Sequence, residues 1–211
     1  MNLLKNGFSL AEMLITLAII GVVATITMPA LQVNTQKAQV IPALKKAVNT
    51  LETVNQQIIH DYEVRALRSV LEDDWSNYDE LLKNYLVGST RAGANYFFNT
   101  ENGGIGANTA IVGKDSIAFF VYNGAEIDGR TYRQVAVDTN GVKAPNRFGK
   151  DVFIVYVDSI DGSVTPKGST SLATQDQSNW TNKCANDSEP VDPQYCFGAI
   201  VENGWEIRYK Y

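Results

Sequence analysis

The chain has 211 residues, a formal net charge of −5 and 45% hydrophobic residues. This length suits one globular domain of ordinary size together with a separate segment, and the acidic balance argues against binding of nucleic acid over a broad basic surface. The 10 tyrosines, the 16 glycines and loops rich in Asn and Ser favour an extracytoplasmic, turn-rich β domain over a helical cytosolic enzyme.

The first predicted element is an apolar helix. Met13 to Leu31 contains no charged residue, and a membrane-spanning helix requires about 20 such residues. A secretory signal peptide has a shorter apolar stretch followed by a small-residue cleavage site, which is not found after Leu31. Lys5 precedes the segment, so we expect this end in the cytoplasm and the remainder outside. Glu12 places a carboxylate at the front of the apolar run, where a charge is costly and indicates a function.

The stretch Lys5–Ala24, KNGFSLAEMLITLAIIGVVA, closely resembles the prepilin leader of type IV pilins and type II secretion pseudopilins. The resemblance implies that a prepilin peptidase cuts between Gly7 and Phe8, and that Phe8 is then N-methylated. It also identifies Glu12 as the glutamate that this family carries inside the apolar run. The fold it implies is a pilin-like α+β fold, in which a long N-terminal α-helix, membrane-spanning in its first half, packs on an antiparallel β-sheet.

Electrostatics predicts a partner for Glu12. After cleavage, the ammonium group of Phe8 would lie in apolar surroundings, where an unpaired charge is costly. In a staggered filament, Glu12 of one subunit can face the Phe8 amine of its neighbour, and the pair would set the stagger. The alternative is a glutamate that reaches only to the lipid headgroups.

Helical periodicity continues beyond the apolar segment and predicts one long helix that ends near His60. Pro29 and Pro42 are expected to kink or loosen this helix. The apolar stripe of its second half recurs at steps of three and four residues: Ile41, Leu44, Val48, Leu51 and Ile58.

The chain is therefore expected to divide into four parts. These are a leader (residues 1–7), a transmembrane or filament-core helix (8–31), the amphipathic second half of that helix (32–60) and an extracytoplasmic globular α+β domain (61–211). A second helix is predicted from Ser76 to Leu86, with Ser76 as its N-cap. A glycine-rich loop is expected at Gly103–Gly106.

Strands are predicted where β-branched and aromatic residues cluster between turn residues. Three such runs are Ser116–Tyr122, Tyr132–Asp138 and Asp151–Val157. The last 16 residues, CFGAIVENGWEIRYKY, are predicted to form a hairpin with Asn203–Gly204 as its turn.

Two further sites are predicted in this domain. Cys184 and Cys196 are the only cysteines, and in an exported chain they are expected to form one disulfide. Asp138, Asn140, Asn146 and Asp151 offer the hard oxygen ligands that calcium prefers, although they lack the EF-hand order. The alternative is that this stretch forms two solvated turns.

No enzymatic motif is found in the sequence. His60 is the only histidine and is expected to be exposed on the helix, and no nucleophile or nucleotide-binding motif accompanies it. Basic residues such as Arg130, Arg133 and Lys150 are interleaved with acids, so no clear nucleic-acid partner is expected.

The leading hypothesis is a structural subunit, pilin or pseudopilin, of a type IV pilus-like or type II secretion filament. Its expected partners are other subunits, a prepilin peptidase/methyltransferase, the inner-membrane assembly platform and the membrane. The expected location is the bacterial inner membrane, with the globular domain in the periplasm or on the cell surface. The alternative hypothesis is a membrane-anchored binding or adhesin domain that does not polymerise.

Overall fold

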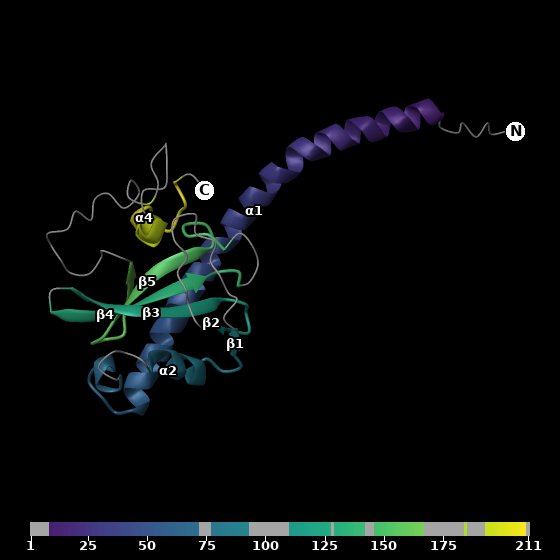
Figure 1. The fold of residues 1–211 in the computed structure, drawn as a ribbon. Helices are drawn as coiled ribbons and strands as arrows, with labels where there is room; N and C mark the ends of the chain where they lie inside the picture. Colours follow the sequence, from purple (N-terminus) through teal and green to yellow (C-terminus); the bar gives the residue numbers. More distant parts are fainter. Residues whose placement is uncertain are drawn as a thin grey trace, which may run out of the picture. The chain divides into compact units, whose positions relative to one another are not determined.

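The computed structural model describes residues 9–71, 77–92, 110–127, 129–141, 146–166, 184 and 193–209. The chain forms two compact units, residues 1–39 and residues 40–211. Helix α1 (Leu10–Asp61) contributes to both units (Figure 1). The predicted long helix is thereby confirmed, and its helical assignment continues through both Pro29 and Pro42.

The part of α1 in the first unit is apolar and exposed. Leu10–Met28 is long and apolar enough to cross a membrane, judged by length and composition, and none of it is buried. Leu10 is 81% exposed and Ile26 is 71% exposed. A helix that is apolar on every side is stable only when another apolar medium or partner covers it.

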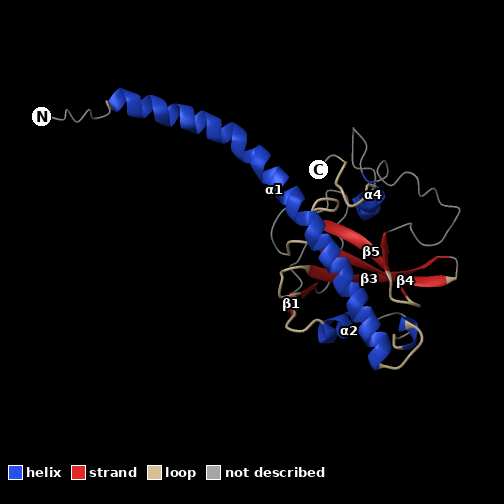
Figure 2. Cartoon of the chain, turned by 180° about the vertical axis from the view of Figure 1, so that it is seen from behind, coloured by secondary structure: helices blue, strands red, loops and turns tan. Residues whose placement is uncertain are grey.

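The part of α1 in the second unit is amphipathic. Leu44, Leu51 and Ile58 are fully buried, which confirms the predicted apolar stripe. Lys45 and Lys46 are exposed on the opposite side. Figure 2 shows this part of α1 lying across one face of the β-sheet.

The sheet has six antiparallel strands in sequence order. Each strand pairs with the next one along the chain, so every connection joins two neighbouring strands. The strands are β1 (Thr90–Ala92), β2 (Ala110–Val112), β3 (Ala118–Ile127), β4 (Arg130–Asp138), β5 (Val152–Asp158) and β6 (Val164–Pro166). The three predicted strands correspond to β3, β4 and β5.

Strand β5 is buried on both faces. Phe153 and Val155 belong to the core cluster that includes the stripe of α1, whereas Val152 and Ile154 belong to a second cluster on the other side of the sheet. This alternation is the two-residue period of a strand. It explains why the strand is an unbroken apolar run in the sequence.

The predicted second helix is shorter than expected. A 3-10 turn (Leu67–Ser69) precedes it, and helix α2 covers Tyr78–Tyr85. Its N-cap is Asn77, which makes no side-chain capping hydrogen bond. The predicted cap, Ser76, and the glycine loop Gly103–Gly106 lie outside the described residues.

The predicted C-terminal hairpin is wrong. A 3-10 turn (Pro193–Tyr195) leads into helix α4 (Cys196–Glu202). Asn203 Nδ2 donates to the carbonyl oxygen of Ala199 at 2.8 Å, and Gly204 has a positive φ of 69°. Asn-Gly therefore ends a helix here, because the left-handed conformation that suits a hairpin turn also suits a helix C-terminus.

Candidate functional site

The start of α1 is stabilised by a reciprocal cap between Ser9 and Glu12. Glu12 Oε2 accepts a hydrogen bond from the Ser9 amide at 2.8 Å, and the Glu12 amide donates to Ser9 Oγ at 3.2 Å. This is a capping box, which satisfies amides that have no partner within the helix. Sequence reasoning missed it, although the spacing S-L-A-E is its signature.

The cap uses only one of the two carboxylate oxygens of Glu12. Only Oε2 accepts from Ser9, and Oε1 has no hydrogen bond within the described part of the chain. The side chain is exposed at the end of an apolar helix. The predicted cleavage residues, Gly7 and Phe8, lie outside the described residues.

Within the second unit, a buried polar cluster fastens α1 to the turn between β5 and β6. Tyr78 Oη donates to Asn55 Oδ1 at 2.8 Å, and Asn55 Nδ2 donates to the carbonyl oxygen of Gly162 at 2.8 Å. Asn55 and Tyr78 are both fully buried. Burial raises the pKa of the Tyr78 hydroxyl far above its usual range, so this group stays a hydrogen-bond donor.

Close approach of the two backbones depends on Gly162. Its φ is +69°, and a Cβ at this position would lie 2.6 Å from Asn55 Cβ. Glycine adopts this conformation without strain and leaves room for the helix. The cluster therefore fixes where α1 lies on the sheet.

The four residues predicted to bind calcium are brought together in one loop. Asp151 is 1% exposed. Its Oδ2 accepts from Asn140 Nδ2 at 3.1 Å and from the Asn146 amide at 2.8 Å, and its Oδ1 accepts from the Arg147 amide at 2.7 Å. Asp138 Oδ1 accepts from the Asn140 amide at 3.0 Å. Burial raises the pKa of the Asp151 carboxyl, and these hydrogen bonds oppose the rise.

The carboxylate of Asp151 is already engaged by hydrogen bonds in this loop. Both oxygens of Asp151 face N–H donors, whereas calcium needs six to eight oxygen ligands. Among the residues that the structure describes, no three His, Cys, Asp or Glu side chains could share a metal ion. The carboxylate of Asp151 instead holds the loop through its own amides. Calcium ligation stays a prediction, which a calcium titration of thermal unfolding would test.

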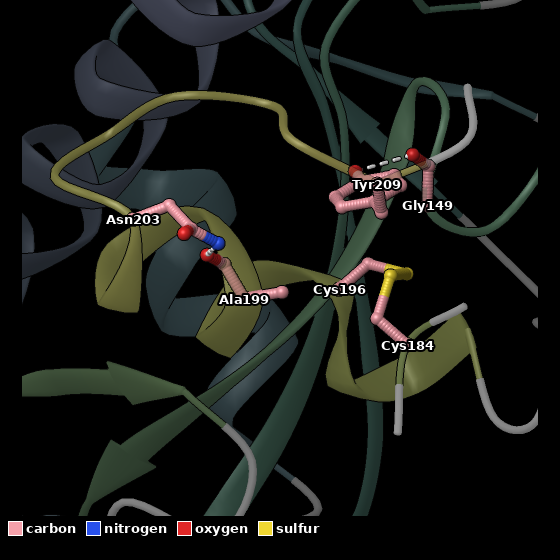
Figure 3. The surroundings of a disulfide bond; sticks show 6 residues. All are labelled: Gly149, Cys184, Cys196, Ala199, Asn203 and Tyr209. Atoms are coloured by element: carbon pink, nitrogen blue, oxygen red, sulfur yellow. Dashed lines mark hydrogen bonds between the residues drawn. A yellow bond between two sulfur atoms is a disulfide. The ribbon is translucent and has the colours of Figure 1, made fainter. Parts of the chain in front are cut away.

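The predicted disulfide joins Cys184 to Cys196 at the start of α4 (Figure 3). Both cysteines are buried, at 0% and 2% exposure. Beyond α4, Tyr209 Oη donates to the carbonyl oxygen of Gly149 at 2.6 Å. This bond ties the end of the chain to the loop that Asp151 organises.

His60 is exposed, as predicted. Its Nδ1 lies 3.1 Å from Asp61 Oδ1, and its side chain is 88% exposed. The hydrogen bond with His60 lowers the pKa of the Asp61 carboxyl. Arg130 forms an ion pair with Asp158 at 3.2 Å, so this basic residue is neutralised within its own sheet.

Comparison with known proteins finds similarity in the N-terminal segment of the chain. Residues 3–28 match the model of the prokaryotic N-terminal methylation motif. A fimbrial protein of Neisseria meningitidis serogroup B is 36% identical over 63 residues, which is 30% of this chain and 37% of that protein. The type IV major pilin protein PilE1 of Neisseria gonorrhoeae is 37% identical over 60 residues, or 28% of this chain and 36% of that protein.

The similarity spans little more than a third of the length of these relatives. No solved structure matches the chain. The apolar N-terminal helix fits a membrane-anchored protein, and the α+β arrangement of α1 with an antiparallel sheet is consistent with a pilin fold. Over its N-terminal segment, this chain carries the prokaryotic N-terminal methylation motif and is similar to type IV pilins.

Proposed function

We propose that this chain is a structural subunit of a type IV pilus-like or type II secretion filament. The observation that carries the proposal is the capped apolar helix Leu10–Met28, none of which is buried and which coincides with the methylation motif at residues 3–28. Such a surface needs lipid before assembly and the helices of other subunits after it. The pilins named among the relatives support the same role.

Maturation occurs at the junction of Gly7 and Phe8. A prepilin peptidase/methyltransferase removes residues 1–7 and methylates the amine of Phe8. The new N-terminus then lies one residue before Ser9, so the capping box becomes the first structural feature of the mature chain.

Assembly uses Glu12. Its carboxylate pairs with the Phe8 amine of a neighbouring subunit while the same side chain caps its own helix. An unpaired charge in apolar surroundings is costly, so registers that separate the two charges are disfavoured. The inner-membrane assembly platform supplies subunits to the filament, with the second unit on the periplasmic or outer side.

Both a pilus and a type II secretion pseudopilus are built from subunits of this kind. The genes beside the one that encodes this chain distinguish the two systems, because each system has its own secretin and its own assembly ATPase. The alternative from a different class is a membrane-anchored binding domain that keeps the apolar helix in the bilayer and never polymerises.

Processing tests the proposal directly. Co-expression with a prepilin peptidase should shorten the full chain by the leader, residues 1–7, and mass spectrometry should detect N-methylated Phe8. A bulky substitution of Gly7 should block the cut, whereas the same substitution at Gly21 should leave it intact. Gly21 is a suitable control because a Cβ there meets nothing within 4 Å. An N-terminus that remains uncut beside an active peptidase would refute the filament proposal.

A further inference from the structure

Part of α1 lies in the second unit and begins at one end of the sheet. In this antiparallel meander, the β2–β3 and β4–β5 connections lie at one end, and the β3–β4 and β5–β6 connections lie at the other. Lys46 pairs with Asp115 of the β2–β3 turn at 2.9 Å, so this part of α1 begins at the first end. Asn55 Nδ2 donates to Gly162 of the β5–β6 turn, so α1 finishes at the second end.

The segment that follows α4 also lies at the first end. Lys45 Nζ is 5.0 Å from the centroid of the Trp205 ring, and Tyr209 Oη donates to Gly149 of the β4–β5 connection at 2.6 Å (Figure 3). Trp205 has a left-handed φ of 66°, a conformation that is strained for a bulky residue. Its amide donates to the carbonyl oxygen of Ile200 at 2.8 Å, which is a bond of the helix C-terminus. These contacts hold the ring beside the start of α1.

Cations outnumber acids on the surface of this end, although the whole chain has a net charge of −5. We define the basic patch as the lysines and arginines that are exposed or half-buried here: Lys45, Lys46, Lys114, Arg147, Lys150 and Arg208. Among the described residues, the exposed acids nearby are Asp115, Glu202 and Glu206, whereas Asp138 and Asp151 are buried. Glu206 pairs with Arg208 at 2.7 Å. Lys114 is exposed, and no ion pair is found for it within the described part of the chain.

The end of the sequence adds residue types that are common at membrane surfaces. Residues 205–211 are WEIRYKY, with three aromatic residues, two cations and one acid. Tryptophan and tyrosine are enriched where a membrane meets water, because their rings are apolar and carry a polar group. Clustered lysines and arginines are attracted to anionic headgroups. The basic patch together with Trp205 therefore fits the surface of a bilayer that contains anionic phospholipid.

The chain itself keeps the basic patch close to a membrane. The apolar helix ends at Met28, and the second unit starts at Val40. The helical rise between these residues is only about 18 Å. The headgroup layer occupies about 5–8 Å of this distance, and the remainder only slightly exceeds the Debye length of about 8 Å at physiological ionic strength. A lipid surface is therefore always within reach of the patch, whereas an acidic protein would have to be recruited from solution.

We propose that the basic patch docks the second unit on the anionic phospholipid headgroups of the membrane that holds the apolar helix. The contact belongs to the subunit before assembly. It rests on the membrane anchoring in the proposed function and does not depend on polymerisation. A subunit that enters a filament must give up this contact, so anionic lipid retains unassembled subunits at the bilayer.

Fluorescence quenching in vesicles that contain the full chain tests the contact. Both cysteines are joined in the disulfide, so one introduced cysteine can carry a fluorophore. Ser116→Cys places the fluorophore on the β2–β3 turn. Ser69→Cys is the matched control, because both serines are exposed and the neighbouring Arg68 amide donates to Ser159 at the other end of the sheet. A phospholipid with a nitroxide on its headgroup is the quencher.

The vesicles consist of phosphatidylcholine alone, or of phosphatidylcholine and phosphatidylglycerol in equal parts. Quenching at Ser116→Cys should be stronger with phosphatidylglycerol. It should fall to the level of phosphatidylcholine vesicles at a salt concentration of about 1 M, where the Debye length is about 3 Å. Quenching at Ser69→Cys should be the same in both kinds of vesicle.

Neutralising cations provides an independent readout in the same vesicles. Adding Lys45→Gln and Lys114→Gln should weaken docking about fivefold for each lysine. The matched control adds Arg65→Gln and Arg68→Gln, two exposed cations at the other end of the unit, and should leave docking unchanged. The melting temperature of each variant checks that the second unit remains folded.

Three outcomes would overturn the lipid contact. These are equal quenching at Ser116→Cys in both kinds of vesicle, docking that survives the loss of both lysines, and a Ser69→Cys label that responds to phosphatidylglycerol as strongly as the Ser116→Cys label. The filament proposal is judged separately by the N-terminus. A chain that stays uncut beside an active peptidase but docks on phosphatidylglycerol would refute the filament and leave the lipid contact standing. A chain that does not float with vesicles would refute both.

Discussion

Replacing Glu12 by Gln separates the two roles that the structure and the proposed function assign to this side chain. Gln serves in capping boxes as Glu does. In the unmodified chain the Ser9 amide lies 2.8 Å from Glu12 Oε2, and the side-chain oxygen of the glutamine in Glu12→Gln should accept the same hydrogen bond. It cannot form an ion pair with the Phe8 amine. Ser9→Ala is the matched variant, because it removes the Oγ acceptor of the Glu12 amide and leaves the carboxylate charged.

The two losses differ in magnitude. Loss of a helix cap costs about 1 kcal/mol, which corresponds to roughly a fivefold change in an equilibrium constant. Removing one partner of a buried ion pair costs about 3–5 kcal/mol because the other charge is left alone. Since about 1.4 kcal/mol is tenfold, Glu12→Gln should weaken subunit addition by a factor of roughly 100 to 4,000. Ser9→Ala should weaken it only about fivefold.

The assay is the amount of filament sheared from cells that express equal levels of each variant. Mass spectrometry of the N-terminus checks that leader removal and methylation are unchanged. We expect filaments from Ser9→Ala and none from Glu12→Gln. If Glu12→Gln assembles as well as the unmodified chain, the ion pair is refuted and Glu12 acts only as a cap.

Three other perturbations test the second unit by thermal or denaturant unfolding of the full chain in detergent. Tyr78→Phe leaves Asn55 Oδ1 buried without its donor, which should cost about 1–3 kcal/mol and lower Tm by about 2–4 °C per kcal/mol; an unchanged Tm would contradict the role of the cluster. Loss of the disulfide, by replacing Cys184 and Cys196 with Ala, should cost about 3 kcal/mol, and a loss below about 0.5 kcal/mol would count against it. Burial raises the pKa of the Asp151 carboxyl in the folded chain, so folding favours the neutral carboxyl. This contribution to the unfolding free energy is fully present below the unfolded pKa of about 3.9, and it is lost as pH rises through the folded pKa. The unfolding free energy of the unmodified chain relative to Asp151→Asn should therefore fall as pH rises above about 4, and a flat difference would refute this reasoning.

The sequence alone determined the elements whose residues contact one surface in a regular repeat. The apolar stripe of α1 at Leu44, Leu51 and Ile58 is buried as its spacing predicts, because a helix brings every third or fourth residue to one side. The runs that became β3, β4 and β5 were recognisable from their β-branched and aromatic residues. The methylation motif was recognisable because its chemistry depends on a contiguous stretch.

Only the tertiary structure decided features that depend on distant partners. The short apolar run after Cys196 suits a helix or a strand equally by periodicity, and it is a helix because Phe197 and Ile200 pack into the same core cluster as Phe153 of the sheet. Asn55 is a polar residue on a helix, and nothing near it in sequence explains its burial. Its hydrogen-bond partner, Gly162, lies 107 residues away, and folding alone brings the two together.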